Sequence, residues 1–176
     1  MKYFTPELLE RLQSSDEDES EKADEAWDLA IKRSNRRMAG IKKWLPKGVR
    51  KFEEDRICLH DAQLLRMARH DDVIEMVLET EPPSRDLVVL SFRLSGDPEI
   101  DRAALPGRCE SGRADWLYEE WDVDRAGRCH FEVLLSNGWS VKLPVRDLNY
   151  QIARRLFPED ELKQTTTSPS TMAEPA

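Results

Sequence analysis

The sequence predicts an α+β fold in which amino-terminal helices pack on an antiparallel meander of about five or six strands, followed by a short closing helix. Two patterns lead to this prediction. Before residue 57, apolar residues recur every three or four positions, as on one face of a helix. After residue 73 they alternate with polar residues, as on one face of a strand. The chain has 176 residues, enough for a single domain over 1–160, and its polar tail 161–176 is expected to be disordered.

The helical part is expected over residues 5–56. Thr5 can cap a short first helix, because its side chain can accept from the backbone and Pro6 suits the first helical position. A run of acidic residues follows. Either Ser14 or Ser15 caps a second helix there, or the acidic run forms a mobile link.

The clearest predicted element is a helix of about 25 residues whose apolar stripe extends from Trp27 to Leu45. Pro46 ends this helix or begins another short one, in which Val49 and Phe52 would face inward. Acidic residues near the start of the long helix and lysines near its end complement the helix dipole.

The sheet part is expected over residues 60–145. Alternating apolar and polar residues predict strands at 73–80, 87–94, 116–123, 129–135 and 139–145. Segment 62–69 has helical propensity, whereas the turn signal that follows it suggests a partner strand, so its residues leave both open. The family resemblance described below favours the strand. Asn137-Gly138 is typical of a hairpin, because both residue types accept positive φ. Prolines and glycines in 95–115 predict a long loop.

The closing helix is expected over 147–157. Asp147 would cap it, and Leu148, Ile152 and Leu156 are spaced by four, as on one helical face.

Composition limits the classes of function. The net charge of −8 disfavours nonspecific binding to DNA or anionic lipid. No apolar run is long enough to span a membrane, and no signal-peptide core is present, so a cytoplasmic location is expected. Three widely spaced cysteines favour reduced thiols. Nucleotide-binding glycine motifs are absent, and no cofactor is expected.

His60 and Asp61 are the candidate catalytic residues, for a small hydrolase or a metal-dependent enzyme. Neighbouring residues on a strand point to opposite faces, so the sequence does not imply that the two side chains touch. We favour a structural role, in which Asp61 binds backbone amides at a turn and His60 packs against a helix.

A metal site could in principle combine Cys58 and His60 with Cys129 and His130. Their spacing matches no known zinc motif, so no metal is expected. The acidic residues Glu119, Glu120 and Asp122 could do acid–base work or hold a divalent cation. Glu120 and Asp122 alternate with apolar residues, so we favour the solvated face of a strand.

A basic cluster over 32–56 holds ten lysines and arginines against three acids. It offers nucleic-acid binding as an alternative function. Negative overall charge and the lack of an accompanying aromatic motif disfavour that alternative. Several of these basic residues flank the apolar stripe, so they are expected on the solvent side of the long helix.

Three motifs resemble a family of small uncharacterised bacterial proteins. They are the opening Met1-Lys2-Tyr3-Phe4-Thr5, the central Leu59-His60-Asp61, and Asp147-Leu148 after a hairpin. The resemblance implies an α+β domain in which the central motif leads into a β-meander, and it implies no activity. A similar His-Asp segment before a meander occurs in some immunity proteins of bacterial toxin systems.

The function expected from the sequence is noncatalytic binding of another protein, of the immunity type. Trp116, Tyr118, Trp121 and Trp139 are the candidate binding residues, because aromatic side chains on a partly exposed sheet face make good interface anchors. The identity of the partner and the oligomeric state are not predicted.

Overall fold

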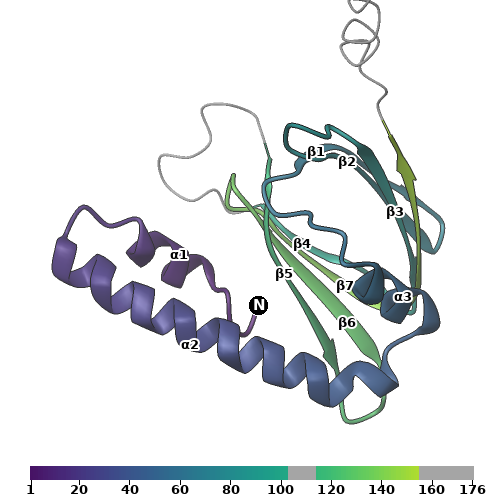
Figure 1. Ribbon diagram of the computed structural model, residues 1–176. Coiled ribbons are helices and arrows are strands. Elements are labelled where there is room, and N and C mark those ends of the chain that lie inside the picture. The colour runs from purple at the N-terminus through teal and green to yellow at the C-terminus, as the bar shows by residue number, and fades with distance from the viewer. Residues whose placement is uncertain (103–113, 155–176) are drawn as a thin grey trace, which may run out of the picture.

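The computed structural model describes residues 1–102 and 114–154. Within these residues the helices come first and the strands follow (Figure 1). The helical elements are α1 (Pro6–Leu12), α2 (Glu17–Ile41), the 3-10 turn η1 (Lys42–Trp44) and α3 (Lys47–Asp55). The strands are β1 (Gln63–His70), β2 (Val73–Glu79), β3 (Leu87–Leu94), β4 (Glu99–Asp101), β5 (Trp116–Val123), β6 (Cys129–Leu135) and β7 (Ser140–Ala153). The α+β prediction is confirmed, and so is the strand expected at 62–69.

The strands form one antiparallel sheet in the order β1-β2-β3-β7-β6-β5, and β4 pairs with the start of β7. The sheet curls until its two outer strands meet at one end (Figure 1). There the amide of Leu64 donates to the carbonyl of Ala114, and the amide of Trp116 donates to that of Ala62, each at 2.8 Å. The curled sheet therefore encloses one main core, with α2 along β5 and α3 against β7.

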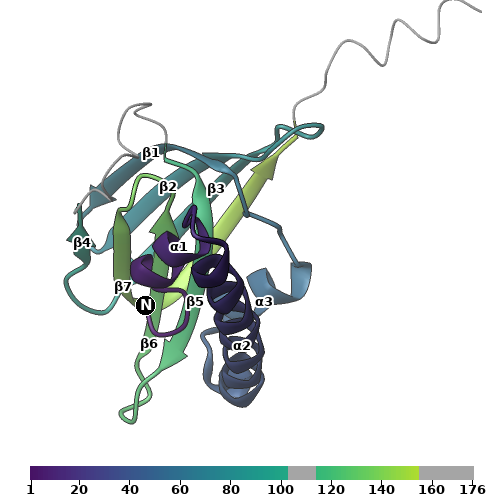
Figure 2. The ribbon, with the colours of Figure 1, turned by 90° about the vertical axis from the view of Figure 1, so that its left-hand side faces the viewer.

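A second, smaller core lies on the outer face of β5 and β6, beneath α1 and α2 (Figure 2). Its buried members are Phe4, Leu9, Trp27, Ala30 and Leu134. Both faces of β5 and β6 are therefore covered, which alternation along the strands alone does not reveal.

The helix starts follow from capping. The Oγ1 of Thr5 accepts from the amide of Leu8 at 3.2 Å, as predicted for α1. The prediction that Ser14 or Ser15 caps α2 is wrong. Asp16 caps it instead, its Oδ1 accepting from the amide of Glu19 at 3.1 Å, so the acidic run forms the first turn of α2. The predicted helix length of about 25 residues is confirmed, but α2 ends at Ile41, before Leu45, and the lysines expected in its last turn lie in η1. The inward-facing Val49 and Phe52 of α3 are also confirmed.

The prediction of a closing helix at 147–157 is wrong, because β7 continues to Ala153 and pairs with β3. A spacing of four is even, so Leu148 and Ile152 share a face on a strand just as they would on a helix. As a strand, residues 147–153 pair with the backbone N–H and C=O groups of β3, which would otherwise lie unpaired. Residues 155–157 and the tail 161–176 lie outside the described residues.

Asp147 does cap a helix, but the helix is α3. Its Oδ1 accepts from the amide of Gly48 at 2.9 Å. This bond joins the first turn of α3 directly to β7.

The predicted hairpin at Asn137-Gly138 is confirmed between β6 and β7, with the amide of Leu135 donating to the carbonyl of Trp139 at 2.9 Å. Only Gly138 adopts positive φ, at 83°, whereas the Oδ1 of Asn137 accepts from the amide of Trp139. The predicted loop 95–115 contains the short strand β4, and residues 103–113 of that loop lie outside the described residues.

Candidate functional site

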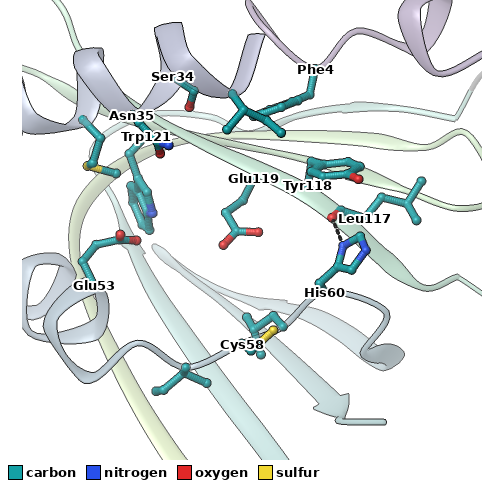
Figure 3. A pocket seen from close by; sticks show the side chains of 14 residues that line it. Phe4, Ser34, Asn35, Glu53, Cys58, His60, Leu117, Tyr118, Glu119 and Trp121 are labelled. Carbon is teal, nitrogen blue, oxygen red and sulfur yellow. Dashed lines mark hydrogen bonds between the residues drawn. The ribbon is translucent and has the colours of Figure 1, made fainter. Parts of the chain in front are cut away.

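A cavity of about 360 Å³ opens where α2, α3, the segment before β1 and strand β5 meet. Glu119 lies at the centre of this pocket, with Glu53 on one side and His60 on the other (Figure 3). Cys58 lies below Glu119 in this view, and Asn35 of α2 lies above it. Apolar side chains complete the walls, among them Ile31, Met38, Ile57 and Leu59. The pocket therefore combines apolar walls with a few converging polar groups, as small-ligand sites do.

Glu119 faces inward in step with Trp121 and Val123, and a bulge in β5 brings Trp116 to the same side. Trp116 is opposite Leu135, while Tyr118 is opposite the adjacent residue Leu134, so one residue of β5 is left over. The bulge puts Trp116 on the inner side together with Glu119, and the Nε1 of Trp116 donates to the Oε2 of Glu119 at 2.6 Å. Burial raises the pKa of Glu119, and the hydrogen bond from Trp116 only partly offsets this rise.

Glu53 faces the same cavity from α3 (Figure 3). Its pKa is raised first by burial and then by the charge of Glu119, while Trp121 and Lys42 oppose the rise. The two carboxyl groups are therefore coupled, because ionising one makes it harder to ionise the other.

Trp121 presents a hydrogen-bond donor to the pocket. Its side chain is only 5% exposed, and the indole nitrogen faces the interior near Glu53 and Glu119 in Figure 3. Within residues 1–102 and 114–154, the Nε1 of Trp121 is a buried donor without a hydrogen-bond partner. Most buried N–H groups in proteins have a hydrogen-bond partner, so the unpaired N–H of Trp121 marks the pocket as a candidate binding site.

His60 and Asp61 form a contact that the sequence did not imply. They lie at a turn, where Asp61 adopts a φ of 62°, and the Nε2 of His60 is 3.4 Å from the Oδ2 of Asp61. The Nδ1 of His60 lies 2.7 Å from the carbonyl of Leu117, which requires it to donate, and the ring packs on Tyr118 rather than on a helix. Both ring nitrogens therefore have neighbours, which does not favour His60 as a free general base.

The four candidate aromatic residues have different positions. Trp116 is 1% exposed and belongs to the main core, so it cannot anchor a partner at the surface. Trp121 is also buried, and its side chain forms part of the inner wall of the pocket. Tyr118 is half-buried at the pocket, while the half-buried Trp139 lies elsewhere, with the guanidinium of Arg102 over its ring at 5.0 Å.

The acidic residues of β5 do not form the solvated face that their alternation suggested. Glu120 is 8% exposed, and its carboxylate accepts from the backbone amides of Lys2, Tyr3 and Phe4 at 2.7–2.8 Å. This clamp holds the amino-terminal segment on the outer face of β5 and positions Phe4 at the rim of the pocket.

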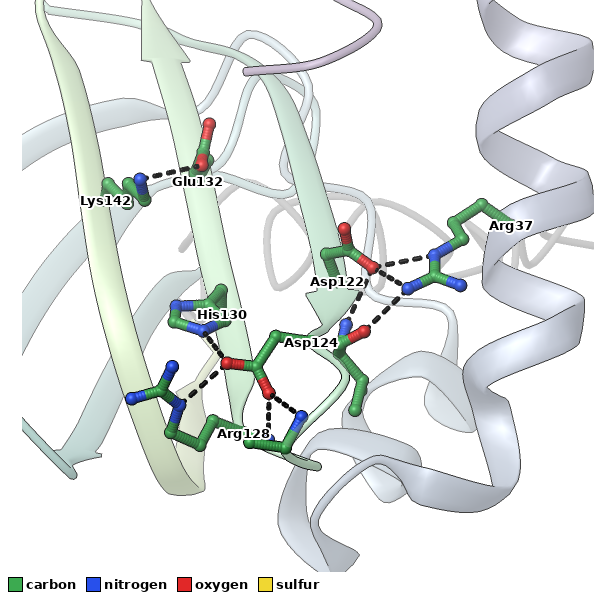
Figure 4. Close-up of polar contacts among 9 residues, drawn as sticks. Arg37, Asp122, Asp124, Arg128, His130, Glu132 and Lys142 are labelled. Carbon is green, nitrogen blue, oxygen red and sulfur yellow. Dashed lines mark hydrogen bonds and ion pairs between the residues drawn. The ribbon is translucent and has the colours of Figure 1, made fainter.

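The basic cluster is partly used to hold the fold together. The Nε of Arg37 donates to Asp122 at 2.7 Å, and its terminal nitrogen donates to the carbonyl of Val123 at 2.6 Å (Figure 4). This contact fixes the carboxyl half of α2 on β5. Lys42 pairs with Glu54 at 3.3 Å. The cluster is therefore not one uninterrupted basic surface.

Cys58 is an exposed free thiol, whereas Cys129 is a buried one. In the described part of the chain, no three or more His, Cys, Asp or Glu side chains gather in a way that could hold a metal ion. Nor does any helix in that part have the length and apolarity to cross a membrane.

Comparison of the chain with models of known families and with curated proteins finds no match. The function of the pocket must therefore be argued from its own residues.

Proposed function

We propose that the protein is a noncatalytic domain that binds another protein, and that the pocket between α2, α3 and β5 receives part of this partner. The observation that carries the proposal is the unpartnered indole N–H of Trp121, which faces a cavity shared with Glu53 and Glu119. An unpaired buried N–H is costly, and so are two ionised carboxyl groups that face each other in one cavity. A bound group that satisfies these side chains offsets that cost.

The charge of the protein supports a basic partner. The chain carries a net charge of −8, and two acidic side chains face the pocket. Electrostatic complementarity favours the encounter with a basic surface. Masking of a basic partner in the bacterial cytoplasm, as an immunity protein masks its toxin, is the form of binding that we propose on the basis of the Leu59-His60-Asp61 motif.

Affinity capture with the full chain as bait tests this function. Ile31 is 38% exposed at the pocket rim, and Leu29 is 50% exposed on the same helix without lining the pocket. The Ile31→Arg variant should lose the partner, because it brings positive charge to the binding site of a basic protein, while Leu29→Arg should retain it. Failure to recover any stoichiometric partner from cells that express the protein naturally, or equal recovery with both variants, would refute the proposal.

A further inference from the structure

We infer that the pocket binds a guanidinium group, supplied by an arginine side chain of the partner. This inference rests on the proposed function and specifies the chemistry that the pocket recognises. It is argued from the two converging carboxyl groups, the unpartnered donor beside them and the aromatic walls.

Two acidic side chains make the pocket complementary to a positive charge. Glu53 on α3 and Glu119 on β5 are half-buried and face one cavity. Without a ligand, two neighbouring negative charges in a partly desolvated site are unfavourable, and the charge of Glu119 raises the pKa of Glu53. A cation between them stabilises both ionised forms, so the pocket is complementary to one positively charged group.

The indole N–H of Trp121 is a buried donor whose pairing would depend on the ligand. The N–H of Trp121 faces Glu53 and lowers its pKa, but no acceptor among the described residues lies within hydrogen-bond geometry of it. An ionised Glu53 could use one oxygen for this N–H and the other for the cation. Binding of a cation, ionisation of Glu53 and pairing of Trp121 are therefore expected to occur together.

The aromatic walls of the pocket suit a flat cation. Phe4, Tyr118 and Trp121 supply aromatic surface to the pocket walls. A guanidinium is planar, stacks on aromatic rings and offers several N–H donors in a fork that fits carboxylates. An ammonium group is compact and more strongly hydrated, so it matches these walls less well.

Binding should depend on pH. The titratable groups that surround Glu53 and Glu119 are Cys58, His60, Asp61 and Tyr118, together with Lys42, which acts on Glu53 from η1. A guanidinium needs both carboxyl groups ionised, so binding releases protons and strengthens as the pH rises through their titration.

The test is a titration of the ¹⁵N-labelled full chain with N-acetyl-arginine-N-methylamide, followed through the indole N–H signal of Trp121. The Trp121→Phe variant assigns the signal. At pH 8 the signal should shift with added probe, and the response should weaken at pH 5. Glu119→Gln and Glu53→Gln should each weaken binding roughly 30-fold or more, as is typical when one partner of a buried charge pair is removed. Glu81→Gln, which removes the same charge from an exposed loop, should have no effect.

Three results would overturn the inference: no shift in the wild type, an unchanged shift in the Glu53→Gln/Glu119→Gln double variant, or an equal response to N-acetyl-lysine-N-methylamide. Amide spectra of the variants establish that each is folded. Absence of a probe response with capture still dependent on Ile31 refutes the guanidinium and leaves the proposed function standing. A probe response without any captured protein supports the guanidinium chemistry and refutes the proposed function.

Discussion

Gly48 of α3 lies directly against the backbone of Leu148 in β7. A β-carbon at position 48 would stand 1.8 Å from the carbonyl oxygen of Leu148 and 2.8 Å from the Oδ1 of Asp147. This close approach, with the hydrogen bond from Gly48 to Asp147, sets the position of α3 and therefore that of Glu53 over the pocket.

Gly48→Ala should destabilise the protein by about 2 kcal/mol or more, because α3 would have to move away from β7. Gly40→Ala is the matched control. No atom lies within 4 Å of a β-carbon at Gly40, and alanine is the better helix former, so stability should rise by up to about 1 kcal/mol. Urea denaturation measures both changes. Equal denaturation midpoints for the two variants would contradict the close packing of α3.

Glu120→Gln should loosen the amino-terminal segment, because an amide carries no negative charge to hold three backbone N–H groups. The expected loss of stability is about 2 kcal/mol, in the range found for hydrogen bonds to charged groups. Hydrogen exchange should become faster at Tyr3 and Phe4. Glu81→Gln serves as the control, and exchange rates that match in the two variants would argue against the clamp.

Glu119→Gln should change how stability depends on pH. Burial raises the pKa of Glu119 above its ordinary value of 4.5, so the folded state binds more protons than the unfolded state just above that pH. This penalty is absent below pH 4.5 and grows as the pH rises through the folded pKa, at about 1.4 kcal/mol for each pKa unit of the rise. The variant should therefore gain stability over the wild type between pH 4 and pH 8 in denaturation experiments. Parallel pH profiles would show that Glu119 titrates normally.

The two described cysteines should differ in reactivity. Cys58 is exposed at the pocket, while burial raises the pKa of Cys129 to about 12 and keeps its thiol protonated. Iodoacetamide at pH 8 should label Cys58 in the folded protein and label Cys129 only after denaturation. Peptide mass mapping separates both from Cys109. Rapid native labelling of Cys129 would be inconsistent with its position in the core.

The fold was largely predictable because its signals are local. The alternation in β5 and β6 predicted both strands from end to end, and the apolar stripe predicted the length of α2. The closing helix failed because Leu148 and Ile152 fit either period, and only the pairing with β3 decides between them.

The site was less predictable because distant segments build it. Glu53, His60 and Glu119 meet only when the sheet curls and β1 joins β5, and no local pattern encodes that closure. One signal was present in the sequence: Glu119 alternates in step with Trp121 and Val123, which marks it as an inward-facing acid.

The central claim is that Glu53 and Glu119 share one pocket and influence each other's charge. An NMR titration of the ¹³C-labelled glutamate carboxyl groups measures this directly. The pKa values of both residues should lie above 4.5, and Glu119→Gln should lower that of Glu53. Ordinary pKa values for both residues, with no change at Glu53 in the variant, would contradict the account.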